Sequence, residues 1–286
     1  MSATLELEHP PEATEDDLAR RKHRKRLIMS VGDKGGSGKS TAIKIVAELH
    51  LARRRKLLLI DGDATVGTLY KYHPEVVQPF SIHGPIDERD RLVNEYLSRG
   101  VETVIVDLPA TSLTRLREMS AEYSFVEEVE RAGYRLTVVA PVTPNDDPIL
   151  DLQEVIGLFD PENYALFSAW DESSPMADHP PEAKPSRFDI VAFVNMSFAE
   201  DRSDFQLWDA SQPGGFTRRL MEFVGGVEIE IPKLRPRIQH LLQRYRLSYR
   251  GAETSPNLSV TDRGRIQRWN KSVNEVVTGV GERLGF

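Results

Sequence analysis

Cysteine is absent from all 286 residues of the sequence, and this excludes several classes of protein at once. Disulfide-stapled domains, thiolate metal sites, iron–sulfur clusters and enzymes with a thiol nucleophile all need that residue. An excess of positive charge is lacking too, since 37 basic residues against 44 acidic ones give a formal net charge of −7. Any surface that binds nucleic acid must therefore be a local one.

Long apolar stretches are also missing. No run approaches the roughly 20 apolar residues of a membrane-spanning helix, and the polar N-terminus has no apolar segment of signal-peptide length. We therefore expect a cytoplasmic protein, which would be associated with the nucleoid if it binds DNA. Its hydrophobic content of 40% is sufficient for a buried core.

Apolar runs of strand length alternate with helix-like segments along most of the chain. Runs rich in Val, Ile and Leu cover residues 26–31, 56–61, 102–107, 135–141, 189–195 and 227–231. Segments of helix length and mixed polarity cover residues 39–53, 88–98, 114–131 and 148–159, and a last amphipathic segment covers 263–284. This alternation predicts an α/β fold with a doubly wound, mostly parallel sheet flanked by helices.

The domain organisation follows from where this alternation holds. Residues 1–25 are charged and contain proline, which is typical of a flexible tail. Residues 26–286 are expected to form a single domain. Within it, residues 160–187 are rich in proline and acid, and we expect an inserted surface loop there because a further core-type strand follows.

The segment "DKGGSGKS", residues 33–40, has the composition of a phosphate-binding loop but lacks its first glycine. The general pattern is a glycine, any four residues and then Gly-Lys-Ser/Thr, and Asp33 occupies the position of that glycine. The other parts are present, because an apolar run precedes the glycines and a helix-like segment follows them. Lys39 would then contact the β and γ phosphates, and Ser40 would ligate magnesium.

With Lys34 included, the loop reads Lys-Gly-Gly-Ser-Gly-Lys-Ser and resembles that of the deviant Walker A P-loop ATPases, the ParA/MinD superfamily, in particular its ParA-like partition branch. Members of this branch tolerate a residue other than glycine before the first lysine. The resemblance implies a P-loop NTPase fold of the SIMIBI type, with ATP and Mg²⁺ as cofactors. It assigns nucleotide binding to Lys34, Gly35, Gly36, Ser37, Gly38, Lys39, Ser40 and Thr41.

Lys34 carries a further implication of the resemblance. In the family, the matching lysine reaches the nucleotide of a second subunit, so that two protomers sandwich two ATP molecules. We therefore expect an ATP-dependent homodimer, in which Lys34 and Lys39 are both catalytic. The plain alternative is an exposed lysine on a loop.

Carboxylates at the ends of two apolar runs supply candidates for hydrolysis. "LLLIDGDAT" resembles the switch I segment of the family, which assigns Asp63 to the positioning of the attacking water. A simple Asp-Gly turn also explains Asp61. "VETVIVDLPA" has the Walker B arrangement, which makes Asp107 the second metal residue beside Ser40. The interval between Lys39 and Asp107 is short for the family, so a crossover unit is expected to be reduced or missing.

Two later positions resemble the base-recognition residues of the family. Asn195 ends an apolar run, and Pro232 follows the next one, where the family has an asparagine and an Ile-Pro loop against adenine. A guanine-specific Asn/Thr-Lys-x-Asp motif is absent from the sequence, which favours ATP over GTP. Taken alone, Asn195 could equally be a cap or a turn residue.

The segment from 233 to 250 is basic within an acidic protein. It contains no acid and six cations, which are Lys233, Arg235, Arg237, Arg244, Arg246 and Arg250. These residues could bind DNA phosphates nonspecifically, as in ParA dimers, or could simply be a solvated face.

We therefore expect a slow, partner-stimulated ATPase that segregates or positions cargo such as a plasmid, a chromosome region or a large protein assembly. A cargo adaptor or activating protein would be its partner. The alternatives are a conjugative-transfer accessory ATPase of the TraL type, a membrane-bound MinD-like ATPase and a P-loop metabolic ligase. The last segment has few basic residues and two interior glycines, a poor match to a membrane-targeting helix, and ligases have no need of Lys34.

Overall fold

The computed structural model describes residues 25–63, 67–173, 181–209 and 215–286. The predicted N-terminal tail therefore lies outside the described residues except for Lys25. The three residues Ala64, Thr65 and Val66, which follow Asp63, also lie outside them.

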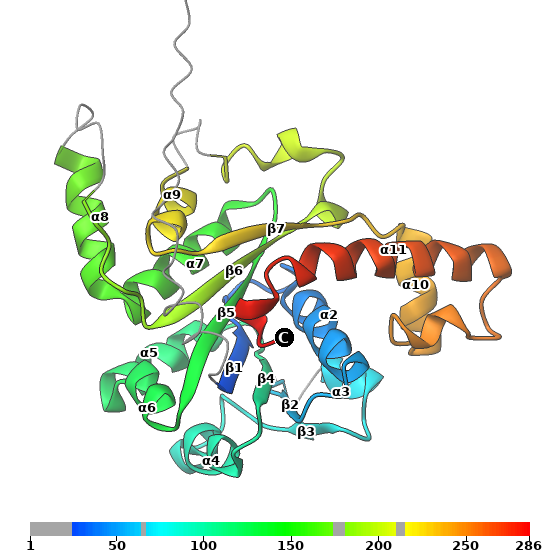
Figure 1. The fold of residues 1–286 in the computed structure, drawn as a ribbon, viewed down its shortest axis with the longest axis horizontal. Helices are drawn as coiled ribbons and strands as arrows, with labels where there is room; N and C mark the ends of the chain where they lie inside the picture. The colour runs from blue at the N-terminus through cyan, green and yellow to red at the C-terminus, as the bar shows by residue number, and fades with distance from the viewer. Residues whose placement is uncertain (1–24, 64–66, 174–180, 210–214) are drawn as a thin grey trace, which may run out of the picture.

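A seven-stranded sheet forms the centre of the molecule, with the strand order β3-β2-β4-β1-β5-β6-β7 (Figure 1). All of its neighbouring pairs are parallel. The strands are β1 (Lys25–Ser30), β2 (Leu57–Asp61), β3 (Val77–Pro79), β4 (Thr103–Asp107), β5 (Tyr134–Val142), β6 (Phe188–Asn195) and β7 (Val227–Ile231). The predicted α/β fold with a parallel sheet is confirmed.

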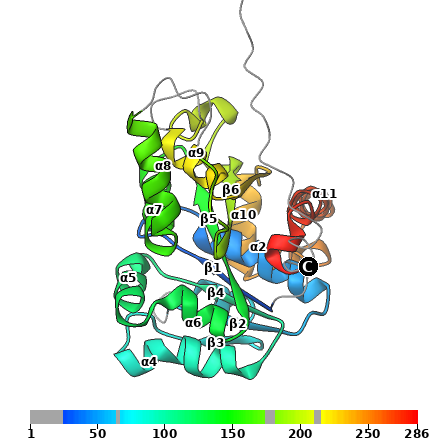
Figure 2. The same ribbon diagram turned by 60° about the vertical axis from the view of Figure 1, so that its left-hand side comes forward.

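Helices cover both faces of this sheet (Figures 1 and 2). One face packs against the helical turns of residues 92–99, which continue α4 (Ile86–Arg91), and against α5 (Ser112–Tyr123), α6 (Phe125–Arg131), α7 (Asp146–Phe159), α8 (Pro161–Ser173) and α9 (Phe216–Phe223). The other face packs against α2 (Lys39–Ala52), α3 (Thr68–Tyr72), α10 (Pro236–Tyr245) and α11 (Val260–Thr278). Each layer of helices buries its own apolar cluster against the strands, as expected when both faces of a parallel sheet are covered.

The region between the loop and β4 contains a strand that the sequence did not predict. Strand β3 has three residues and lies at the edge of the sheet, where Pro79 costs little because an edge strand has one unpaired side. Helix α3 before it has five residues. The crossover unit that was expected to be reduced is therefore present but short.

Two predicted segments differ in detail from the structure. The expected surface loop at 160–187 begins with helix α8, in which Pro161 occupies the first helical position and Phe167 is buried. The predicted helix over 114–131 is divided into α5 and α6, because Ser124 adopts a left-handed backbone with φ of 52°. The structure also begins the last helix earlier, at Val260.

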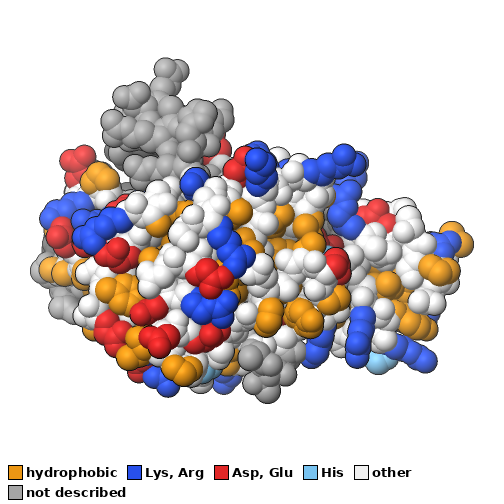
Figure 3. All heavy atoms as spheres, turned by 90° about the horizontal axis from the view of Figure 1, so that it is seen from below, with side chains coloured by type: hydrophobic (Ala, Val, Ile, Leu, Met, Phe, Trp, Pro, Cys, Tyr) orange, Lys and Arg blue, Asp and Glu red, His pale blue; other side chains and the backbone are white. Residues whose placement is uncertain are grey.

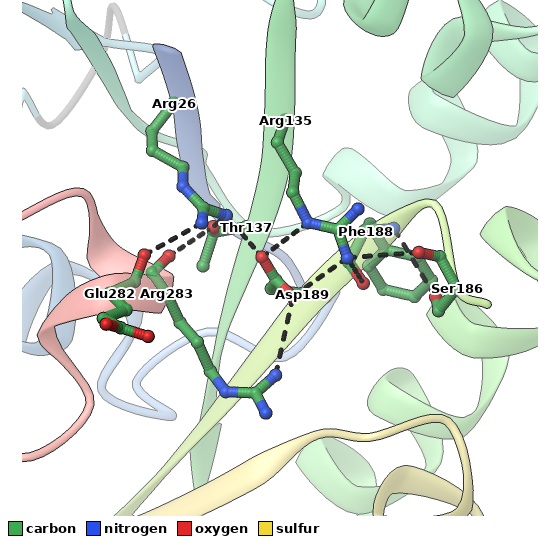
Figure 4. A network of polar contacts seen from close by, with 8 residues as sticks. All are labelled: Arg26, Arg135, Thr137, Ser186, Phe188, Asp189, Glu282 and Arg283. Atoms are coloured by element: carbon green, nitrogen blue, oxygen red, sulfur yellow. Dashed lines mark hydrogen bonds and ion pairs between the residues drawn. The ribbon is translucent and has the colours of Figure 1, made fainter. Parts of the chain in front are cut away.

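The C-terminal turn is attached to the amino ends of the central strands by a buried ionic network (Figure 4). Asp189 in β6 pairs with Arg26 in β1 and with Arg135 in β5, whose Nε lies 2.7 Å from the carboxylate. Arg26 also donates to the carbonyl oxygen of Glu282 at 2.8 Å. Burial alone would raise the pKa of Asp189, but hydrogen bonds and charge from the two arginines outweigh it and hold that pKa well below its usual range. The network stabilises the end of the sheet opposite to the loop described next.

Candidate functional site

The glycine-rich loop connects β1 to α2 at the carboxyl end of the central strand (Figure 1). Gly36 and Gly38 have φ values of 77° and 99°, in the left-handed region that favours glycine. A Cβ atom added to Gly35 or Gly36 would meet no heavy atom within 4 Å, so the outer side of the loop is open. The first turn of α2 has no side-chain cap, and its backbone N–H groups and dipole are available to an anion.

The Lys39 side chain is folded inside this loop and is only 6% exposed. Its Nζ donates to the carbonyl oxygen of Lys34 at 2.7 Å, and the Ser37 hydroxyl donates to the same oxygen at 3.1 Å. Burial lowers the pKa of Lys39, while the charges of Asp151, Asp107 and Asp33 oppose that shift. An ammonium held by one backbone carbonyl beside an uncapped helix start is a suitable binding group for phosphate oxygens.

Asp33, in the position of the missing glycine, joins the loop to two helices of the opposite layer. Its carboxylate accepts a hydrogen bond from the backbone N–H of Leu113, in the first turn of α5, at 2.9 Å. Its own N–H donates to the carboxylate of Asp151 in α7 at 2.8 Å. The negative charge is thus directed to a helix N-terminus, where it is favourable.

Ser40, in the first turn of α2, and Asp107, at the end of β4, lie close together. The Asp107 carboxyl is buried at the end of β4 and lies within hydrogen-bonding reach of the side chains of Ser40 and Ser30. Burial raises the pKa of Asp107 to about 7, an effect that the hydrogen bond from Ser40 opposes. A buried carboxyl beside a hydroxyl fits the magnesium ion of P-loop enzymes, which takes its remaining ligands from phosphates and water. In the described ranges no group of three or more His, Asp or Glu side chains forms a metal cage.

The two aspartates of the predicted switch segment have different surroundings. Asp61 is buried, and its carboxylate accepts from the backbone N–H groups of Tyr70 and Asp63 at 2.8 and 3.1 Å. It therefore caps α3, in agreement with the simple turn interpretation. Asp63 is half-buried at the edge of the site, and its carbonyl oxygen accepts from Gly67 at 2.8 Å.

The Lys34 side chain extends from the loop toward α7 and not toward Lys39. Its side chain is 56% exposed, and its Nζ lies 2.8 Å from the carboxylate of Asp147 at the start of α7. This hydrogen bond and the charge of Asp147 raise the pKa of Lys34. Because the pair is exposed, solvent screens it and the lysine can leave it easily.

Asn195, at the end of β6, lies beside the loop next to Gly38. A Cβ atom on Gly38 would lie 3.2 Å from the Asn195 Nδ2 and 3.3 Å from the ring of Phe198. The Asn195 Oδ1 accepts from the backbone N–H of Ser197 at 3.0 Å, which leaves its amide N–H groups for other acceptors. Pro232 is placed less directly, since its carbonyl oxygen accepts from the indole of Trp269 at 2.7 Å and its neighbour Ile231 lines the adjoining cavity.

A cavity of about 290 Å³ opens between the first turn of α2 and the ends of β6 and β7. Its lining combines aromatic, apolar, hydroxyl and amide side chains with a single charged one, Lys44. Neither Lys44 nor the exposed aromatic ring of Phe198 was identified from the sequence. Lys44 lies one turn after Thr41 in the helix predicted over residues 39–53, and no sequence signal showed its burial.

Lys44 is held in an aromatic cage. Its Nζ lies 3.3 Å from the ring centroid of Tyr72 and 4.2 Å from that of Tyr249. Burial lowers the pKa of Lys44 to about 8, and the charge of Glu48 opposes the shift. The ammonium is therefore largely charged at neutral pH inside the protein.

The basic segment forms α10 and the chain around it, at the right-hand end of the molecule in Figure 1. Seen from below, Lys and Arg side chains gather at this end (Figure 3). Arg235, Arg244, Arg246 and Arg250 are exposed. Arg237 is exposed as well but lies 3.4 Å from Asp262, and Lys233 donates to the carbonyl oxygen of Ala199 at 2.7 Å.

Three solved structures are similar to this one in chain path. A putative plasmid partition protein of Borrelia burgdorferi, bound to AMPPNP, is 14% identical with a TM-score of 0.46, and the match covers 90% of this chain and 99% of that one. The septum site-determining protein MinD of Pyrococcus horikoshii, complexed with Mg-ADP, is 16% identical with a TM-score of 0.48, over 91% and 98% of the two chains. A chain of the MinC:MinD cell division complex of Aquifex aeolicus is 15% identical with a TM-score of 0.44, over 85% and 95%.

These likenesses are distant, and the assignment of the site rests on the geometry of this chain. No protein-family model and no curated protein matches the sequence. None of the helices in the described parts of the chain is long and apolar enough to cross a membrane.

Proposed function

We propose that the chain is a magnesium-dependent ATP hydrolase that dimerises around bound ATP and uses this switch to segregate or position cargo. The observation that carries the proposal is the convergence of Lys39, Ser40 and Asp107 at the uncapped start of α2. Lys34, the additional lysine of the deviant loop, supports the dimerisation part of the proposal. Cofactors are ATP and Mg²⁺.

Each residue of the loop has a separate task in this proposal. When the nucleotide binds, Lys39 would exchange its hydrogen bond to the Lys34 carbonyl oxygen for hydrogen bonds to phosphate oxygens. The backbone N–H groups of residues 35–41 would surround the same phosphates. Ser40 and Asp107 would hold the magnesium ion, which neutralises charge on the phosphates. Asp63 would orient the attacking water, and Asn195 with the Ile231-Pro232 turn would contact the base.

Lys34 provides the test of the dimer. Its ammonium is exposed, and among the described residues it forms the screened pair with Asp147, so it can reach a second subunit at little cost. We expect Lys34→Ala to keep ATP binding but to lose the dimer that wild-type protein forms with a nonhydrolysable ATP analogue, measured by light scattering on a sizing column. Lys56→Ala removes an exposed lysine at the opposite ends of the strands and should still dimerise. A Lys34→Ala protein that dimerises like wild type would refute the switch.

The exposed cations on and around α10 support nonspecific DNA binding as the output. We expect duplex DNA to be retarded in gels only with ATP, and binding to weaken steeply with salt. Replacing Arg244, Arg246 and Arg250 by alanine should lower the slope of log affinity against log salt concentration by about 0.9 for each phosphate that the protein no longer neutralises. Replacing Arg115 and Arg117 on α5 is the matched control.

The alternatives are outcomes of the same measurements. If the protein cosediments with anionic liposomes and does not retard DNA, the surface that it binds is a membrane and not DNA. A stoichiometric ligated product from a small acid would replace the switch by a metabolic ligase. A cargo adaptor or activating partner is expected to raise the rate of phosphate release.

A further inference from the structure

The chain that follows α10 is a tight turn with two of the exposed cations. In residues 246–250, here called the basic turn, the buried Tyr249 comes between the exposed Arg246 and Arg250 in the sequence. Arg246 ends α10 in a left-handed backbone conformation with φ of 50°. Such a backbone is uncommon for a residue other than glycine, so contacts with other elements must hold the turn in this shape.

Glu48 in α2 holds the backbone of the basic turn. Its side chain is buried, and the backbone N–H groups of Tyr249 and Arg250 donate to its two carboxylate oxygens at 2.9 and 3.0 Å. A buried carboxylate that accepts two backbone N–H groups is satisfied by them and fixes their position. The same carboxylate lies 3.7 Å from the Nε2 of His73, directly after the last residue of α3.

Lys44, one turn earlier in α2, makes a second connection of the same kind. The two rings of its cage belong to Tyr72, the last residue of α3, and to Tyr249 in the basic turn. Its Nζ also lies 3.4 Å from the carbonyl oxygen of Leu247 in that turn. Residues four apart lie on one face of a helix, so Lys44 and Glu48 together join the end of α3 to the basic turn. We call this pair the α2 bridge.

The other end of α3 is attached to the predicted switch segment. The backbone N–H of Gly67, just before α3, donates to the carbonyl oxygen of Asp63 at 2.8 Å. The N–H of Tyr70 donates to the carboxylate of Asp61, also at 2.8 Å. With five residues, α3 is little more than one turn and about 7.5 Å long. A displacement of the switch segment therefore moves Tyr72 as well.

We propose that Lys44 and Glu48 couple the nucleotide site to the basic turn. A nucleotide that displaces the switch segment shifts α3, and the α2 bridge passes this shift to the backbone of Tyr249 and Arg250. The cations on either side of Tyr249 are redirected as a result. Packed buried networks suit this role because they have discrete arrangements and do not deform continuously. The inference rests on the proposed function for the nucleotide and for the partner of the cations.

Amide hydrogen exchange reports on the α2 bridge directly, because the two groups that donate to Glu48 are backbone amides. Glu48→Gln keeps one acceptor oxygen and loses the charge. At least one of the Tyr249 and Arg250 amides should then exchange roughly tenfold to hundredfold faster in the unliganded protein. Glu253→Gln is the matched control, since it removes a carboxylate that accepts from Asn270 beside the same turn. It should leave both rates unchanged.

Tyr72→Leu tests the coupling itself, since it removes a ring from the Lys44 cage and leaves the hydrogen bonds to Glu48. Exchange is measured without ligand and with Mg²⁺ and a nonhydrolysable ATP analogue at saturation, which calorimetry establishes for each protein. In wild type the analogue should change the exchange of the Tyr249 and Arg250 amides, but not that of amides in α6 in the opposite layer. In Tyr72→Leu the unliganded rates should stay close to wild type and the response should be lost. Tyr72→Phe keeps the ring and should respond like wild type.

The outcomes separate this inference from the proposed function. A response in Tyr72→Leu as large as in wild type would overturn the coupling, and so would a bound analogue that leaves the amides of the basic turn unchanged in wild type. Tyr72→Leu should also lower the factor by which the analogue raises DNA affinity, and an unchanged factor would overturn the link to the cations. If wild-type protein does not bind the analogue, the proposed function fails instead.

Discussion

Substitution of Asp33 tests whether the residue that replaces the usual first glycine stabilises the loop or is a defect in it. Its carboxylate accepts the backbone N–H of Leu113 at 2.9 Å, at the start of the 12-residue helix α5. Loss of a capping acceptor costs about 1 kcal/mol, and loss of a negative charge at a helix N-terminus costs a further ~0.3–1 kcal/mol. Asp33→Ala should therefore lower the free energy of unfolding by about 1.5–2 kcal/mol.

Two further substitutions separate the contribution of the hydrogen bond from that of the charge in this free energy of unfolding. Asp33→Asn keeps the oxygen that accepts from Leu113 and loses the charge, so it should cost about 0.5 kcal/mol. Asp33→Gly restores the general loop pattern, but it loses the cap and also adds backbone freedom worth roughly 0.5–1 kcal/mol, since Asp33 has no positive φ. The expected order of destabilisation is therefore Asn, then Ala, then Gly.

The assay is urea denaturation of the three variants, followed by titration with ATP. Glu75→Ala removes an exposed carboxylate from the turn before β3 and should change stability by less than about 0.5 kcal/mol. If Asp33 were a defect in the loop, the glycine variant would be as stable as wild type and would bind ATP more tightly. Either result would refute the role of Asp33 as a brace between the loop and α5.

Three further predictions follow from buried ionisable groups. Asp189→Asn leaves Arg26 and Arg135 without their buried counter-charge and should lower the free energy of unfolding in urea by about 3–5 kcal/mol, whereas Glu127→Gln, in an exposed pair with Arg187, should have a small effect. Burial lowers the pKa of His50 to about 4, so the unfolded chain binds a proton first and stability should fall by up to about 3 kcal/mol as the pH drops from 6.5 to 4. Urea titrations should show this slope in wild type and in the exposed-site control His240→Gln, but a smaller slope in His50→Gln. Asp107→Asn should reduce phosphate release from ATP by at least about a hundredfold without lowering the melting temperature of the unliganded protein, because the change removes a buried carboxyl whose pKa burial raises to about 7; a variant that retains activity would exclude Asp107 from the metal site.

The parallel sheet could be predicted because its buried strands have a clear signal in the sequence. Runs such as residues 102–107 are apolar at nearly every position, and β4 is buried on both faces. Strand β3 had no such signal, since three edge residues that include proline have neither length nor alternation. Helix α8 was hidden for a related reason, because the prolines and acids of its neighbourhood dominate the composition and Pro161 is compatible with a helix start.

The site was predictable where local pattern decides geometry and not where tertiary packing does. The order of loop, β4 carboxylate and β6 asparagine follows from parallel strands ending at one edge, so Lys39, Asp107 and Asn195 could be expected to meet. Burial of Lys44 depends on Tyr249, which lies more than two hundred positions away in the chain. Arg26 is a similar case, since it opens the predicted strand run 26–31, yet nothing in that run showed that its side chain would be fully buried against Asp189.

Helix α2 offers two sides to a nucleotide, and this has a consequence for how ATP could act on DNA. Lys39 lies inside the proposed phosphate loop, while Ser40, Thr41 and Lys44 line the cavity whose outer wall is α10. On that helix Gln239 lines the cavity, and the Arg237 side chain is 76% exposed on the surface. A helix with its side chains is only about 10 Å across, so a shift of α10 on filling of the cavity would move the cations directly. Coupling between the proposed base-binding site and the proposed DNA surface then needs one movable helix and no relay through the sheet.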